Sequence, residues 1–282
     1  MKTVSPADDA AMMQQLIQLA CRAGAAIMQV YRCSVAGVTS KADGSPLTAA
    51  DLVAQRTIID GLARLAPEIP LLSEEAAVIP YAERVRWKRF WLVDPLDGTR
   101  EFIERNGEFT VNIALVEDGK PVLGVVYAPV TDVAYHAARG TGAFMQRGNQ
   151  AARSISVKSR APGEALRVVV SRSHRDARTE ALLGRLGNHQ CIAMGSSLKL
   201  CLVAEGVAHF YPRLGPTMEW DTAAAHAIVS EAGGRVCDLS GLELRYNKQD
   251  LHNPGFFVLP AGDRALWAQL ETACSMPAPA AD

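Results

Sequence analysis

The feature that most constrains the fold is an apolar run that ends abruptly in acids. Residues 90–93 are Phe-Trp-Leu-Val, and residues 94–99 are Asp-Pro-Leu-Asp-Gly-Thr. A short apolar run bounded by turn-forming residues predicts a buried strand. When such a strand ends in two carboxylates, it directs several oxygen ligands at one point, as a hard cation such as Mg²⁺ requires. We therefore expect this strand to lie inside a sheet and to end at a metal site.

Two further acidic segments match this strand end. Glu74 follows a predicted strand at 69–72, and Asp221 stands where a long Ala-rich helix begins. Together with Asp94, Asp97 and the Leu96 backbone carbonyl, these acids form a candidate site for two or more Mg²⁺ ions. Crowded carboxylates repel one another, so a cation is their natural partner. Taken singly, the acids have plainer interpretations, such as a turn at Asp97 or a helix N-cap at Asp221.

The first half of the chain shows two helical periods and then a strand pattern. The expected helices run from about Pro6 to Val30 and over 49–65. The antiparallel meander that follows is predicted over 109–116, 122–128 and 133–138. A Gly-rich stretch at 140–152 is expected to close an N-terminal α+β domain, residues 1–158, which carries most of the metal ligands.

After a linker predicted at 159–163, strands and helices alternate. This alternation predicts a C-terminal α/β domain, residues 159–282, which contributes Asp221 and the substrate-binding residues. The expected strands lie near 166–170, 191–194, 207–211 and 256–258. The expected helices lie near 175–186, 197–205, 222–232 and 265–273. The fold class is therefore α/β (α+β), with layered sheets and helices.

Composition excludes several function classes. The 282 residues are 49% hydrophobic and 21% charged, and the net charge is -1, so bulk electrostatics attracts neither nucleic acid nor an anionic membrane. Six cysteines without a C-x-x-C pair argue against zinc and favour a reducing, cytoplasmic compartment. The polar N-terminus has no signal-peptide core, and no window is apolar enough to span a bilayer.

Glu74, the run at 94–99 and the distant Trp220-Asp221 occur in an order that resembles the inositol monophosphatase-like, Mg²⁺-dependent, lithium-sensitive phosphatases. The resemblance runs from about the first helix to the strand near Val258. It implies a layered αβαβα sandwich and two or three Mg²⁺ ions. It also implies that Glu74, Asp94 and the Leu96 carbonyl hold one metal. Asp94, Asp97 and Asp221 would hold a second.

The same resemblance assigns catalytic roles. It implies that Thr99 and Asp51 together orient and deprotonate the attacking water, with Glu74 as a further catalytic residue. Asp51 also fits a capping box with Thr48, and the two roles are compatible because a helix N-terminus suits an ionised carboxylate.

The residues after Thr99 indicate a branch of this family. Inositol monophosphatases typically have Asn-Phe two positions past that Thr, whereas this chain has Arg100-Glu101-Phe102 and resembles the bacterial 3'(2'),5'-bisphosphate nucleotidases. The implied reaction removes the 3'-phosphate of adenosine 3',5'-bisphosphate (PAP), giving AMP and phosphate, with PAPS to APS as a second reaction. Such an enzyme clears a by-product of sulfate assimilation.

Substrate contacts follow from the resemblance as well. It implies that four residues hold the nucleotide and its 5'-phosphate, beside Gly98 and Thr99: His174, Ser196, Lys199 and Arg213. From the residues alone, a Ser cap, a solvated Lys and a surface Arg are equally good interpretations. The helix start at 195–199 nevertheless offers backbone N–H groups, hydroxyls and an ammonium that suit a phosphate.

Two alternatives stay open at this point. One is an inositol or other sugar phosphatase with the same metal core, against which Glu101-Phe102 argues. The other is a non-catalytic protein that senses nucleotide or metal. The resemblance suggests weak peripheral association with the inner membrane, although no amphipathic basic helix supports it. The expected partner is a small nucleotide rather than nucleic acid, and the sequence indicates no oligomeric state.

Overall fold

The computed structural model describes residues 6–33, 39–40, 46–173 and 176–275. The N-terminal half begins with two helices, α1 (Pro6–Arg32) and α2 (Ala49–Leu65), and between them the short strands β1 (Thr39–Ser40) and β2 (Pro46–Leu47) pair antiparallel. Seven strands follow: β3 (Leu71–Ser73), β4 (Arg89–Asp97), β5 (Thr110–Glu117), β6 (Lys120–Ala128), β7 (Val133–Ala138), β8 (Gly142–Arg147) and β9 (Arg153–Ile155). Short helices α3 (Tyr81–Arg84) and α4 (Thr99–Ile103) flank β4.

The seven strands form one sheet in sequence order, β3 to β9. β3 and β4 are parallel, and every later pair of neighbours is antiparallel. The predicted meander is therefore confirmed. The Gly-rich stretch at 140–152 contains β8 and leads to β9, two strands that the sequence does not predict. Both strands are short, and their pairing, β8 with β7 and β9 with β8, rather than their own sequence makes them extended.

The C-terminal half supplies the remaining elements: β10 (Leu166–Ser171), α5 (Ala177–Arg185), β11 (His189–Met194), α6 (Leu198–Ala204), β12 (Tyr211–Arg213), η1 (Glu219–Asp221), α7 (Ala223–Glu231), β13 (Gly234–Asp238), β14 (Phe256–Pro260) and α8 (Arg264–Ser275). β10 and β11 pair parallel, and β12, β14 and β13 pair antiparallel in that order. A bridge between Val168 and Phe210 joins the two groups into one layer.

The predicted strand at 207–211 is wrong over most of its length. Both Val207 N–H and Ala208 N–H donate to the Leu202 carbonyl, so these residues close the end of α6. Gly206, at φ +74°, allows the chain to turn there. The strand begins only at Tyr211.

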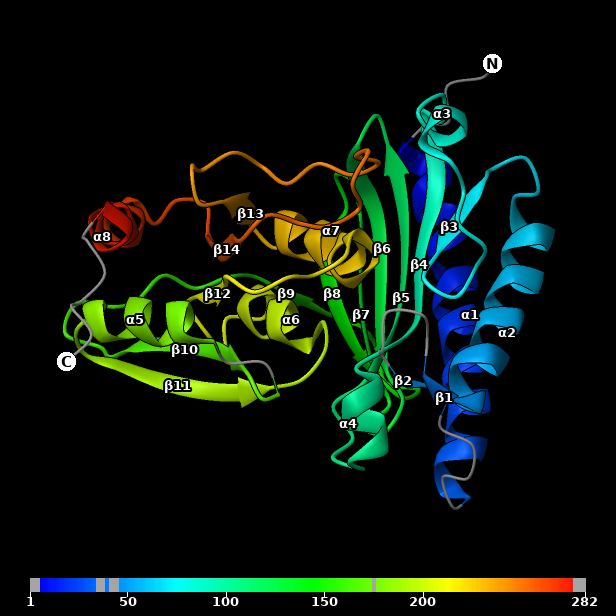
Figure 1. Ribbon diagram of the computed structural model, residues 1–282, viewed down its shortest axis with the longest axis horizontal. Coiled ribbons are helices and arrows are strands. Elements are labelled where there is room, and N and C mark those ends of the chain that lie inside the picture. The colour runs from blue at the N-terminus through cyan, green and yellow to red at the C-terminus, as the bar shows by residue number, and fades with distance from the viewer. Residues whose placement is uncertain (1–5, 34–38, 41–45, 174–175, 276–282) are drawn as a thin grey trace.

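Five layers stack across the molecule (Figure 1). Helices α1 and α2 cover one face of the seven-stranded sheet, and α6 and α7 lie between its other face and the C-terminal strands. Helices α5 and α8 cover the far side of those strands. Three apolar cores fill the spaces between layers, and they include Trp91, Ile228 and Phe257 respectively. The middle core takes residues from both halves, and the boundary at residue 158 stays a prediction.

Helix α7 lies unusually close to the large sheet. A Cβ on Gly124 of β6 would overlap the backbone carbonyl of Ala224. The facing part of α7 is made of alanines, whose small side chains permit this approach. Because α7 is held against the sheet in this way, the residues just before it, including Asp221, lie over the ends of the strands.

Candidate active site

A bulge at the end of β4 explains how two acids three residues apart serve one site. Side chains alternate along a strand, so Asp94 and Asp97 would ordinarily point to opposite faces. Asp94 pairs with Asn112 and Asp97 with Thr110, which leaves one extra residue on β4. Asn112 and Thr110 share a face of β5, and therefore so do their partners. Such bulges re-aim side chains next to functional sites.

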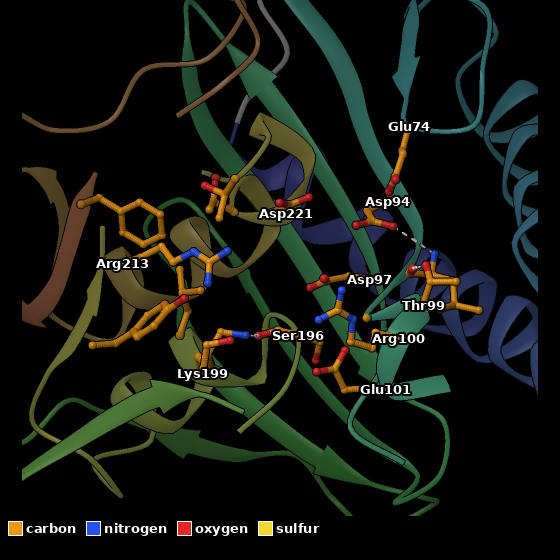
Figure 2. Close-up of a pocket in the computed structure, with 18 residues that line it drawn as sticks. Glu74, Asp94, Asp97, Thr99, Arg100, Glu101, Ser196, Lys199, Arg213 and Asp221 are labelled. Atoms are coloured by element: carbon orange, nitrogen blue, oxygen red, sulfur yellow. Dashed lines mark hydrogen bonds between the residues drawn. The ribbon is translucent and has the colours of Figure 1, made fainter. Parts of the chain in front are cut away.

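Glu74, Asp94 and Asp221 converge at this strand end (Figure 2). Each offers a carboxylate oxygen, and these oxygens lie within 4.8 Å of one another. Glu74 is placed by its own N–H, which donates to the Val93 carbonyl at 3.2 Å and so extends the β3–β4 pairing. One Asp94 oxygen accepts the Leu96 N–H at 3.0 Å.

The electrostatics of these acids call for a cation. Burial raises the pKa of Asp94 well above its usual value, and the charges of Glu74, Asp97 and Asp221 raise it further. The pKa of Asp221 is raised by burial first and then by Asp97 and Glu74. Hard oxygen donors that lie close together and repel one another are the set that Mg²⁺ binds, so these residues fit the metal that their chemistry implies.

Asp221 reaches the cluster from the other half of the molecule. It closes η1, and its carboxylate accepts the Met218 N–H at 2.9 Å, which fixes the turn ahead of α7. Neighbouring Glu219 is fully buried, and its carboxylate accepts the backbone N–H groups of Asn247 and Lys248 at 2.6 and 2.9 Å. These two acids, which Trp220 separates, thus have different roles: Glu219 is bonded into the fold, and Asp221 faces the strand ends.

Asp51 and Thr99 meet beside the cluster. Thr99 Oγ1 donates to Asp51 Oδ1 at 3.4 Å and lies 3.5 Å from the Leu96 carbonyl. The other Asp51 oxygen accepts the N–H and hydroxyl of Thr48 at 2.7 and 2.6 Å. The capping box is therefore present, and the same carboxylate also reaches the Thr99 hydroxyl.

Cationic side chains gather at the opposite end of the pocket. Lys199 is buried, and its ammonium donates to the Ser196 carbonyl at 2.5 Å. Burial lowers the pKa of Lys199 to about 8, while nearby Asp97 acts against that shift. Arg213 ends β12, and its buried Nε has no hydrogen-bond partner among the described residues. The charge of Arg213 also disfavours a charged Lys199, so an anion between them relieves their repulsion.

One cavity of about 360 Å³ contains both ends. Of the predicted site residues, all but two line it: Glu74, Asp94, Leu96, Asp97, Gly98, Thr99, Ser196, Lys199, Arg213 and Asp221. Asp51 does not line the cavity but contacts Thr99, which does. His174 lies outside the described residues.

The cavity also has walls that were not predicted as site residues. Arg100 and Glu101 line it from α4, and Glu101 accepts the Ser173 hydroxyl at 2.7 Å. Tyr211, Thr217 and Phe256 line it from the C-terminal half. The sequence could have indicated Glu101 as a site residue, because Glu101 helps to distinguish this branch of the family. The aromatic residues gave no such indication, because in sequence they look like ordinary core residues.

The Inositol monophosphatase family model matches residues 8–272. The chain belongs to the inositol monophosphatase family. Within this family, it is 54% identical to the 3'(2'),5'-bisphosphate nucleotidase CysQ of Shigella flexneri, over 88% of this chain and 99% of that relative. It is 53% identical to the protein of the same name from Escherichia coli strain K12, with the same coverage.

Solved structures of the family agree in fold. CysQ from Bacteroides thetaiotaomicron superposes with a TM-score of 0.78 at 43% identity, covering 88% of this chain and 96% of that one. The Thermotoga maritima IMPase gives 0.76 at 27% identity, covering 92% and 96%. The expected αβαβα sandwich is therefore confirmed. Among the described helices, none has the length and apolar character that crossing a bilayer requires.

Proposed function

We propose that this chain is a Mg²⁺-dependent 3'(2'),5'-bisphosphate nucleotidase that converts adenosine 3',5'-bisphosphate to AMP and phosphate. The observation that carries the proposal is a single cavity with carboxylates at one end and Lys199 and Arg213 at the other. A substrate with two phosphates can place one at each end. An inositol monophosphate has only one phosphate, so it leaves Lys199 and Arg213 without an anion to bind.

Residue roles follow from this orientation. Glu74, Asp94, the Leu96 carbonyl, Asp97 and Asp221 would hold two or three Mg²⁺ ions. When bound, these ions neutralise the carboxylates and stabilise negative charge on the phosphoryl oxygens. Gly98 and Thr99 line the same end and are assigned to the reacting phosphate.

Thr99 and Asp51 handle the proton of the attacking water. The Thr99 hydroxyl donates to Asp51, so its own oxygen is free to accept a proton from a water in the cavity. Asp51 then takes the hydroxyl proton as general base, while Thr48 holds its second oxygen in place. This relay assigns both residues to orienting and deprotonating water rather than to a covalent intermediate.

The second phosphate is assigned to the cationic end. Lys199 and Arg213 supply charge there, and Ser196 lines the same wall. His174 is proposed as a further contact by family resemblance alone. Inhibition by lithium, activity on PAPS and a cytoplasmic role in recycling the by-product of sulfate assimilation belong to the same proposal. No disulfide bond joins the six cysteines, all of which lie among the described residues, and this is consistent with the reducing compartment.

Phosphate release from adenosine 3',5'-bisphosphate and from inositol 1-phosphate tests this function. Each substrate is assayed with and without Mg²⁺, and with Li⁺ added. We expect Mg²⁺-dependent release from the nucleotide, suppressed by Li⁺, and little release from the inositol ester. Preference for the inositol ester would overturn the nucleotidase assignment and leave the metal residues in place. Absence of turnover of both substrates would favour the sensor alternative.

A further inference from the structure

Ser196 and Ser197 are adjacent hydroxyl residues that face different partners. Ser196 lines the cavity, whereas Ser197 is only 1% exposed and turns to the acidic end. The Ser197 N–H donates to Asp97 Oδ2 at 2.6 Å, and its Oγ lies 2.7 Å from the same oxygen. The same Oγ lies 2.7 Å from the backbone carbonyl of Asp221. Ser197 therefore touches two of the candidate metal ligands, one from each half of the chain.

Asn112 orients the Ser197 hydroxyl. Its side-chain amide donates to Ser197 Oγ at 2.8 Å. A hydroxyl has one proton and two lone pairs, so this bond occupies one lone pair and turns the proton toward Asp97 and the Asp221 carbonyl. Asn112 also pairs with Asp94 across β5 and β4. The contact is thus anchored to the strand pair that carries the bulge.

The consequence for Asp97 is a fixed carboxylate. Its hydrogen bonds within the described structure, from Ser197 and a longer one from Asn112, all fall on Oδ2, which leaves Oδ1 available to a cation. Bonds to a charged acceptor are about twice as strong as neutral ones. Outer contacts that orient a metal ligand commonly change metal affinity by about 10- to 100-fold.

The turn that contains Ser197 also contains Ser196 and leads to Lys199, which are assigned to substrate binding. Ser196 adopts φ +45°, a left-handed conformation that a non-glycine residue holds only with support. Lys199 gives that support through its bond to the Ser196 carbonyl. An anion drawn to Ser196 and Lys199 would therefore steady the turn whose next residue bonds Asp97.

We propose that Ser197 is a positioning residue that orients Asp97 for metal binding and links this orientation to anion binding at Ser196 and Lys199. The second half of this statement rests on the proposed function, because it takes the anion to be the 5'-phosphate of a nucleotide. The first half does not. By thermodynamic reciprocity, a nucleotide 5'-phosphate should then tighten metal binding, and metal should tighten nucleotide binding.

Mn²⁺ titration by calorimetry, without substrate, tests the first half. Ser197→Ala should bind Mn²⁺ about 10- to 100-fold more weakly than the wild type. The matched control, Ser196→Ala, removes the neighbouring hydroxyl and should leave Mn²⁺ affinity within about twofold, since the Ser196 hydroxyl bonds the Leu198 N–H rather than an acid. Wild-type Mn²⁺ affinity in a folded Ser197→Ala variant would overturn the proposal.

Asn112→Ala is a second variant that tests the same contact in case Ser197→Ala does not fold. It keeps Ser197 but removes the amide that orients the hydroxyl, so we expect weaker Mn²⁺ binding in the same direction. Unchanged affinity in this variant would contradict the orienting contact. Thermal unfolding of each variant shows whether the fold is retained.

Adenosine 5'-monophosphate tests the link. We expect it to tighten Mn²⁺ binding several-fold in the wild type and to have no such effect in Ser197→Ala. An equal effect in both proteins would overturn the link. If the enzyme does not hydrolyse the bisphosphate at all, the proposed function fails, while the Mn²⁺ titration without nucleotide still decides the role of Ser197.

Discussion

Single side chains in this protein take their roles from local backbone geometry. The sequence predicts Asp94 and Asp97 as metal ligands because they end an apolar strand. The one-residue bulge that brings both onto one face has no sequence signal, since it depends on the register with β5. Ser197 is hidden for a similar reason, because only the folded turn shows that Ser196 and Ser197 face different partners.

Asp97→Asn tests the acidic end at this scale. The substitution keeps the shape but removes a charge from the cluster. We expect activity to fall more than about 100-fold, beyond the loss typical of an outer contact, and Mg²⁺ to bind more weakly. Steady-state kinetics over a range of Mg²⁺ concentrations checks this. Near-normal turnover in a folded variant would remove Asp97 from the mechanism.

At the scale of elements, the long and strongly patterned segments are predictable. The bounds expected for helix α2 are those that it has, and the same holds for β7. The short strands β8, β9 and β13 are not predictable, because a few residues carry too little pattern and neighbouring strands decide their conformation. The close packing of α7 on β6 cannot be predicted from the sequence either, since it depends on a contact between distant segments.

Gly124→Ala tests the close packing of α7 against β6. Its new methyl group would meet the Ala224 backbone, so α7 must shift or the sheet must yield. Overpacking typically costs about 1–3 kcal/mol, and a displaced α7 also moves Asp221. We expect a lower free energy of unfolding in denaturant and lower activity.

Gly184→Ala in α5 is the matched control. Gly184 is exposed, and nothing lies within 4 Å of the position that its new methyl group would take. In a helix this change should stabilise by about 0.5–1 kcal/mol. Equal behaviour of the two variants would show that α7 does not depend on close contact with β6.

For the whole molecule, the five layers follow from family resemblance rather than from periodicity. Alternating strands and helices indicate layered α/β structure, but not that α6 and α7 lie between two sheets. That arrangement is what gives the site its two ends. The large sheet and α2 bring most acids, while the C-terminal half of the chain brings Asp221, Lys199 and Arg213 (Figure 2).

His136 contributes to the way the stability of the whole fold depends on pH. This side chain is stacked on Phe144, and burial lowers its pKa to about 4. Between that value and the ordinary pKa of 6.5, the unfolded chain binds a proton that the native protein does not. The stability that depends on a neutral His136 is therefore fully present above about pH 6.5 and is lost as the pH falls toward about 4.

His136→Leu should remove this contribution. We expect the loss of unfolding free energy between pH 7 and pH 5 to be smaller by about 2 kcal/mol, from a pKa difference worth about 1.4 kcal/mol per unit. Denaturant unfolding at both pH values measures it. An identical loss in variant and wild type would show that His136 is protonated in the native state.

The central claim is that one cavity binds two phosphates of the same substrate. The reacting phosphate lies at the carboxylate end, and Lys199 and Arg213 bind the other phosphate. The most direct measurement is kcat/KM for adenosine 3',5'-bisphosphate and for adenosine 3'-monophosphate, in the wild type and in Arg213→Ala. The wild type should prefer the bisphosphate, and the variant should lose about 10- to 100-fold of that preference, as expected for one charged hydrogen-bonding group. A preference that is unchanged by the substitution would contradict the account.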